Sequence, residues 1–101
     1  MVLARMATWS FKHNMRVKGF DVLEKTVFEA TRRTKGFRGN ITLLPVGDLD
    51  KGVIITLWDN EAALKAFEKN VFPVKMKTLA AFVTGAPRVK VFRVFSAELR
   101  Q

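Results

Sequence analysis

The chain has 101 residues, 49% of them apolar, and 18 Lys and Arg against nine Asp and Glu give a formal net charge of +9. The absence of cysteine excludes disulfides and thiolate metal sites, and the single histidine, His13, excludes a metal site built from several imidazoles of one chain. No apolar run reaches the roughly 18 to 20 residues of a membrane-spanning helix. The N-terminal segment alternates and contains Arg5, unlike a signal peptide. We therefore expect one cytoplasmic domain over residues 1–101, with no membrane association.

The excess of positive charge has two interpretations. A basic chain can bind nucleic acid. Here, however, the basic residues are dispersed, and the densest cluster, Arg32-Arg33-Thr34-Lys35, falls at a predicted helix end, where cations suit the helix dipole. We favour a solvated basic surface and expect no nucleic-acid partner.

The first half of the chain predicts a strand, a helix and a second strand. Residues 2–11 alternate with apolar side chains on both sides, which favours a strand covered on both faces. A helix is predicted over residues 16–34 from an apolar stripe and two i,i+4 ion pairs: Phe20, Leu23, Val27 and Ala30, with Asp21–Lys25 and Glu29–Arg33. Gly19 favours a first turn at Lys18 to Asp21, and Gly36 ends the helix. The second strand is expected over residues 40–46.

The second half is organised around residues 53–67, where a buried strand runs into Trp58 and a helix follows over residues 60–69. Asp59 is expected to cap this helix, and Leu64, Phe67 and Val71 form its apolar stripe. Pro73 suits the start of a short helix over residues 74–83 with a stripe of Met76, Leu79 and Phe82 or Val83. Residues 88–95 alternate basic and apolar side chains, which indicates an edge strand.

This β-α-β-β-α-(α)-β order predicts an α+β, ferredoxin-like split βαβ sandwich, a four-stranded antiparallel sheet with helices on one face. Strands one and three nevertheless carry apolar residues on both faces. We therefore expect the second face to meet a partner, and a two-fold homodimer packed sheet against sheet satisfies this need.

Two short motifs resemble those of the antibiotic biosynthesis monooxygenase-like family: Gly36-Phe37-Arg38-Gly39 before the second strand, and Trp58-Asp59-Asn60-Glu61-Ala62 with Phe67 after the third. The resemblance extends over about residues 2–95. It implies a dimeric α+β barrel with a pocket between the sheet and the helices of each subunit. Some members oxidise aromatic polyketides with O₂ and no metal or flavin, others bind and degrade haem, and others have no assigned chemistry.

The haem-degrading branch fits this sequence poorly. Trp58 matches that branch, but its first-strand Asn falls near Trp9, and the helix after Val71-Phe72 has no His. The nearest substitute is Met76, and a methionine on an apolar helical stripe is more often a packing residue. The resemblance therefore implies no cofactor, with haem as the lesser option.

Six residues are candidates for the pocket of a small apolar or aromatic ligand: Trp58, Trp9, Arg5, Asn40, Met76 and Phe82. Each tryptophan could equally be a packed side chain whose N–H needs a partner. Arg5 is either one member of a structural ion pair, an outward-facing residue, or an anchor for an anionic or enolate-like substrate. Asn40, Thr42 and Thr56 could orient a carbonyl or simply sit in the sheet. His13 could carry a proton, and no carboxylate pair supports hydrolysis.

Three functions follow. The first is a small cofactor-independent monooxygenase acting on a planar aromatic or quinol- or polyketide-like substrate. The second is an RNA-binding module of the same strand order, but Val53 and Ile55 stand where such modules need aromatic side chains. The third is a non-enzymatic dimeric binding protein for a fatty or aromatic ligand, or for haem without turnover. A pocket filled by its own side chains would favour an inert or purely structural dimer.

Overall fold

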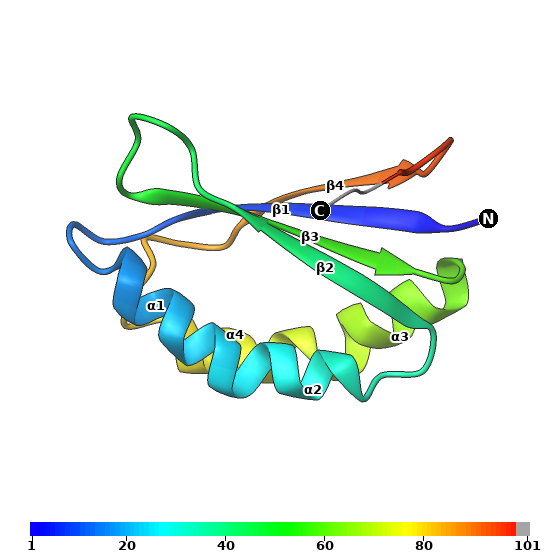
Figure 1. Ribbon diagram of the computed structural model, residues 1–101. Helices are drawn as coiled ribbons and strands as arrows, with labels where there is room; N and C mark the ends of the chain where they lie inside the picture. Colours follow the sequence, from blue (N-terminus) through cyan, green and yellow to red (C-terminus); the bar gives the residue numbers. More distant parts are fainter. Residues whose placement is uncertain (99–101) are drawn as a thin grey trace.

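The helices of the computed structural model lie on one face of a four-stranded antiparallel sheet (Figure 1). The structure describes residues 1–98 except the side chains of Val27, Val74 and Lys75, so the predicted stripe position Val27 lies outside it. The elements are β1 (Leu3–Ser10), α1 (Arg16–Val22), η1 (Leu23–Phe28), α2 (Glu29–Arg32), β2 (Phe37–Leu43), β3 (Lys51–Trp58), α3 (Glu61–Asn70), α4 (Phe72–Leu79) and β4 (Arg88–Arg93). The strand order β2-β3-β1-β4 confirms the predicted ferredoxin-like arrangement and places β4 at an edge.

The first helical run begins at Arg16, so the later start suggested by Gly19 is wrong. The Gly19 amide donates to the Met15 carbonyl at 2.8 Å, and the residue is buried. A Cβ at this position would lie 2.6 Å from Cε1 of Phe11. Glycine is therefore present because the helix passes closely over the end of β1, and the helix starts in spite of its low propensity.

The middle of this run, η1, is a π-helical turn rather than the continuous α-helix expected. The Thr26 hydroxyl donates to the Val22 carbonyl at 2.6 Å, a bond that competes with regular backbone hydrogen bonding. The wider turn buries Leu23 and Phe28, five residues apart, on the same side of the helical run. The two predicted ion pairs, Asp21–Lys25 and Glu29–Arg33, are present at 3.1 and 2.9 Å.

The second strand lies three residues earlier than predicted, at Phe37–Leu43 rather than 40–46. Gly36 takes a φ of +86°, and its carbonyl accepts a hydrogen bond from the Asp59 amide at 2.8 Å. Pairing with β3 therefore starts directly after the turn, with Phe37 opposite Trp58. At the other end, Pro45 has no N–H to donate to a sheet ladder.

The C-terminal half also departs from the prediction at its boundaries. Helix α4 ends at Leu79 rather than Val83, because the following residues bind the end of β1: the Lys12 amide donates to the Phe82 carbonyl and the Thr84 amide to the Ser10 carbonyl, both at 2.9 Å. β4 ends at Arg93 rather than Phe95.

The cap of helix α3 is Asn60, whose side chain accepts from the Ala63 amide at 2.9 Å, so the expected Asp59 cap is wrong. Asp59 instead accepts from Arg38 at 3.0 Å.

The two faces of the sheet differ in cover. The face towards the helices is buried along the central strands, as at Arg5, Ala7 and Trp9 of β1. The opposite face, which we call the outer face, carries half-buried apolar residues of the same strands, with Leu43 and Phe92 at its edges 46% and 47% exposed. No helix covers the outer face within residues 1–98 (Figure 1). The described helices include none long and apolar enough to cross a membrane.

Candidate functional site

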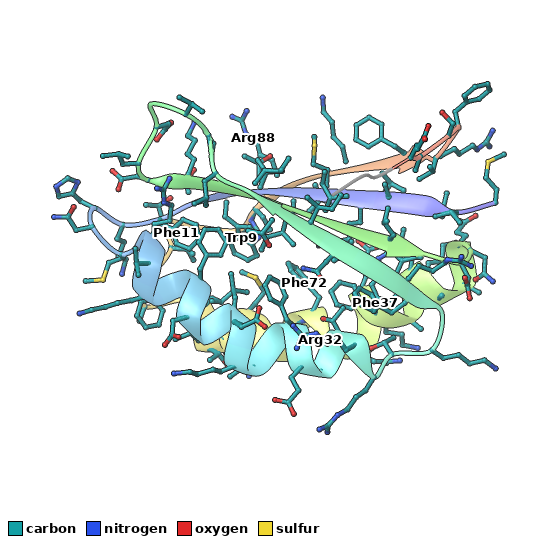
Figure 2. All side chains as sticks on the ribbon, viewed as in Figure 1. Trp9, Phe11, Arg32, Phe37, Phe72 and Arg88 are labelled. Carbon is teal, nitrogen blue, oxygen red and sulfur yellow. The ribbon has the colours of Figure 1, made fainter. Side chains whose placement is uncertain are left out.

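A small cavity lies between the sheet and the helices, with a volume of about 30 Å³. Its sheet side is formed by Ala7, Trp9 and Ile54, its helix side by Leu23, Phe28, Phe67, Phe72, Met76 and Leu79, and its three polar residues are Arg5, Thr31 and Thr56. Figure 2 shows Trp9 and Phe72 in the layer between the sheet and the helices. A cavity of this volume has room for about one or two water molecules.

Arg5 supplies the only charge among the described residues that line the cavity. The residue is 4% exposed, and its guanidinium carbon lies 4.4 Å from the ring centre of Phe72 and 5.4 Å from that of Phe67. These distances fit cation–π contacts. Burial lowers the pKa of Arg5 below its usual value, although the ion pair with Glu68 opposes the shift. Arginine titrates so far above neutrality that the side chain stays charged, and the cavity is therefore electropositive.

The partner of Arg5 is Glu68 of helix α3, whose Oε2 lies 3.4 Å from the Arg5 Nε. Glu68 is not among the candidate residues predicted from the sequence. The position of Glu68 in the helix could have identified it. Glu68 is four residues after Leu64 and one after Phe67, which places a carboxylate along the buried stripe of the helix. Within residues 1–98 no hydrogen bond engages the terminal nitrogens of Arg5. Arg5 is thus one member of an ion pair, and its terminal N–H groups make no hydrogen bond within residues 1–98. The alternative that Arg5 faces outward is wrong, because the residue is buried.

The structure brings three of the six candidate residues to the cavity: Arg5, Trp9 and Met76. The Trp9 ring packs at a tilt against Phe72, with ring centres 6.2 Å apart. Met76 is half-buried on α4, and its unbranched side chain adapts readily to a changed neighbour.

Trp58 lies outside the cavity, in a separate aromatic cluster. It is 0% exposed, and its ring centre lies 4.8 Å from that of Phe67 and 5.5 Å from that of Phe37. Its indole N–H donates to the Thr56 hydroxyl at 2.9 Å. Trp58 is therefore a packed side chain whose N–H has a hydrogen-bond partner, which was the alternative to a pocket residue in the sequence-based prediction.

The remaining candidates are also apart from the cavity lining. Asn40 is half-buried on β2, opposite Thr56. Phe82 lies after α4, next to Gly19. His13 is on an exposed loop, where its Nδ1 lies 3.4 Å from Oδ2 of Asp50.

The residues present do not fit a metal or a haem. No group of three His, Cys, Asp or Glu that could hold a metal ion exists among the described residues. The only described side chain lining the cavity that could act as a neutral axial ligand to haem iron is the thioether of Met76. The cavity instead offers aromatic walls, one cation and two hydroxyls.

No protein-family model matches the sequence, and a search of curated proteins gives no significant match. Solved structures do match. A protein of unknown function from Nitrosomonas europaea is 15% identical with a TM-score of 0.80, and the match covers 99% of this chain and 95% of that one. SnoaB, a cofactor-independent oxygenase from Streptomyces nogalater, is 16% identical with a TM-score of 0.78 and 95% of both chains covered. A candidate antibiotic biosynthesis monooxygenase from Bordetella bronchiseptica is 9% identical with a TM-score of 0.80, covering 94% of this chain and 98% of that one.

The chain has the antibiotic biosynthesis monooxygenase-like fold. This confirms the resemblance that the two short motifs indicated. At these identities the likeness defines the antibiotic biosynthesis monooxygenase-like fold alone, and the same fold carries several chemistries. The fold alone therefore does not identify the function.

Proposed function

We propose that the protein is a cofactor-independent oxygenase for a small planar aromatic or quinol- or polyketide-like substrate, held as its anion beside Arg5. One observation carries this proposal: a buried guanidinium with unused terminal donors at a cavity whose other walls are mostly apolar. Unpaired donors in a low-dielectric site stabilise a developing oxyanion far more than they would in water. The aromatic side chains around the cavity suit a planar substrate.

The reaction requires no electrons beyond those of the substrate. A methylene conjugated with a carbonyl loses a proton to solvent to give an enolate, and the enolate passes electrons to O₂ as the carbon–oxygen bond forms. The resulting peroxide anion takes a proton from solvent and loses water to leave a ketone, so that R₂CH₂ and O₂ become R₂C=O and H₂O. In this scheme Arg5 stabilises the enolate oxygen and the apolar walls exclude bulk water. SnoaB, which shares the fold, is described as a cofactor-independent oxygenase.

The size of the cavity sets a condition on this proposal. Pockets for drug-sized ligands usually measure about 300 to 1,000 Å³, against about 30 Å³ here. A substrate must therefore displace side chains, and those best placed to move are the half-buried Phe72 and Met76 of α4. This helix has no side-chain hydrogen bond at its N-cap, so its first turn lacks one common source of rigidity.

The small volume of the cavity also favours a second candidate function, that of a non-enzymatic dimeric protein. A cavity filled by the protein's own side chains needs no ligand, and the fold would then serve for assembly or for weak binding. Both candidates share one further proposal, that two copies join through the outer face, because its apolar residues have no cover from residues 1–98.

Oxygen uptake separates the two candidates. We would measure substrate binding by calorimetry, and O₂ consumption and product formation, with anthrone and quinol substrates in chelator-treated buffer, using wild type, Arg5→Met and, as a control, Lys77→Gln on the exposed surface. The oxygenase predicts one O₂ per ketone formed, a loss of about 100-fold or more in Arg5→Met and no change in Lys77→Gln. Binding without uptake would leave a ligand-binding protein, and neither binding nor uptake across the panel would leave the structural dimer.

A further inference from the structure

A second group of functional side chains lies at the end of the outer face where β1 stops. Ser10 is four residues along β1 from Met6, which pairs with Ile55 at the centre of the proposed dimer contact, and we place this group outside that contact. It surrounds a depression of about 200 Å³ lined by Thr8, Ser10, Lys51, Thr84, Ala86 and Arg88. The lining includes two cations and three hydroxyls and no carboxylate. Figure 2 shows Arg88 on the side of the sheet away from the helices, so this depression is separate from the Arg5 cavity.

The strand register explains how the two cations converge. Ser10 pairs with Lys51 of β3, and Thr8 pairs with Arg88 of β4, so the cations flank β1 from opposite sides. Paired residues share a face of the sheet, and three adjacent strands span about 10 Å. Two side chains as long as lysine and arginine can therefore reach a group held above the hydroxyls of β1.

Most of these cations and hydroxyls make no close ion pair or side-chain hydrogen bond with the described residues. Within residues 1–98 Arg88 makes no ion pair, and the Lys51 Nζ lies 4.0 Å from the nearest carboxylate oxygen, Oδ2 of Asp48. Neither Thr8 nor Ser10 uses its hydroxyl in a hydrogen bond within that range. Thr84 is different, because its amide and hydroxyl both donate to the Ser10 carbonyl, at 2.9 and 3.3 Å. Thr84 therefore fixes the loop as a wall of the depression.

We propose that this depression binds a dianionic phosphate group. The planar guanidinium of Arg88 can donate two parallel hydrogen bonds to phosphate oxygens, the Lys51 ammonium supplies the second charge, and the hydroxyls of Thr8 and Ser10 can donate to the remaining oxygens. Two cations balance the two negative charges of a phosphate, whereas a carboxylate would leave one cation unmatched. The site also gives part of the +9 charge a role that the Arg5 cavity does not require.

Calorimetric titration tests this proposal independently of any oxygenase activity. Inorganic phosphate and methyl phosphate would be titrated at constant ionic strength into wild type, Arg88→Gln, Lys51→Gln and the control Lys77→Gln, which removes the same charge from helix α4. We expect saturable binding of one phosphate per chain, weakened about tenfold in Arg88→Gln and in Lys51→Gln and unchanged in the control. Binding of the ester as tightly as the free ion would indicate the phosphoryl group of a larger ligand, and binding of the free ion alone would indicate phosphate itself.

Three results would overturn the proposal. Wild type could show no saturable binding, the control could lose as much affinity as Arg88→Gln, or acetate at equal ionic strength could bind as tightly as phosphate. The substituted residues are exposed, so near-native circular dichroism spectra are expected and would show that lost binding is not lost folding.

Discussion

Arg5 is the residue on which the proposed function depends. A buried charge rarely improves the stability of a protein, so its presence needs another explanation. Its ion pair with Glu68 is long at 3.4 Å, and burial works against its charge strongly enough to lower the pKa of the guanidinium. Replacing a buried ion pair with apolar residues is often neutral or stabilising. A residue that adds little to stability and sits at a cavity is a candidate for binding.

This leads to a prediction for Arg5→Met, which keeps most of the side-chain volume and removes the charge. Glu68 remains partly exposed and can be hydrated. Since Glu68 is not left as a buried unpaired charge, we expect the free energy of unfolding to fall by less than about 1 kcal/mol, measured by urea denaturation at pH 7. A loss of more than about 2 kcal/mol, the cost of breaking a needed charge contact, would instead make Arg5 a structural residue.

The hydrogen bond between Trp58 and Thr56 gives a second prediction at this scale. Thr56→Val would leave the buried indole N–H without an acceptor and should cost about 1 to 3 kcal/mol. In Trp58→Phe the donor is gone, so adding Thr56→Val to it should cost less than Thr56→Val alone. Urea denaturation of the four proteins gives the coupling energy, and a coupling near zero would mean that the bond contributes nothing.

The residues of the cavity could be predicted only in part. Arg5 is conspicuous in a sequence as a charge inside an apolar strand, and Trp9 lies on the same side of that strand. The contacts of Arg5 with Phe67 and Phe72 could not be found in this way, since they depend on how α3 and α4 cross the sheet. Trp58 occurs in a motif, and its large apolar ring is equally suited to a cavity wall and to a packed core.

At the scale of elements, periodicity predicted four strands and three helical runs in the observed order, but not the division of the first run into α1, η1 and α2. It failed where a tertiary contact sets a boundary. β2 starts early because the Asp59 amide binds the Gly36 carbonyl, and α4 ends early because the chain after it binds the end of β1. The π-helical turn of η1 has no signal in a pattern that assumes a fixed helical repeat.

The contact between α1 and β1 predicts the effect of Gly19→Ala. Helix propensity alone would make this change stabilising by about 1 kcal/mol. The new methyl group, however, would lie 2.6 Å from the Phe11 ring, and overpacking of this kind costs about 1 to 3 kcal/mol. We expect a net loss in thermal denaturation. Gly85→Ala, where no atom lies within 4 Å, is the matched control and should change little.

At the scale of the whole molecule, the outer face is the feature that an isolated chain leaves unexplained. Central residues of β1 and β3 such as Met6 and Ile55 are apolar and only half-buried there, and helices cover the other face alone. The sequence predicts this imbalance from apolar residues on both sides of strands one and three. It does not contain the geometry of the proposed second copy, which depends on the twist and edges of the sheet.

The dimer proposal predicts that Ile55→Lys shifts the protein towards a monomer, because a charge would be buried at the centre of the interface. Sedimentation velocity over a range of concentrations measures this shift. Val17→Lys places the same charge on helix α1, at a residue 79% exposed, and should leave the sedimentation coefficient unchanged. A wild-type protein that sediments as a monomer at every concentration would exclude the outer-face dimer.

The small volume of the Arg5 cavity also has a consequence for rates. In the proposed oxygenase, a substrate must displace side chains of helix α4 before it can enter and its product must displace them before it can leave. If the protein is an oxygenase, turnover should slow as solvent viscosity rises, while the isotope effect of a deuterated methylene should be small. The turnover rate would then be limited by movement at helix α4 and not by formation of the carbon–oxygen bond.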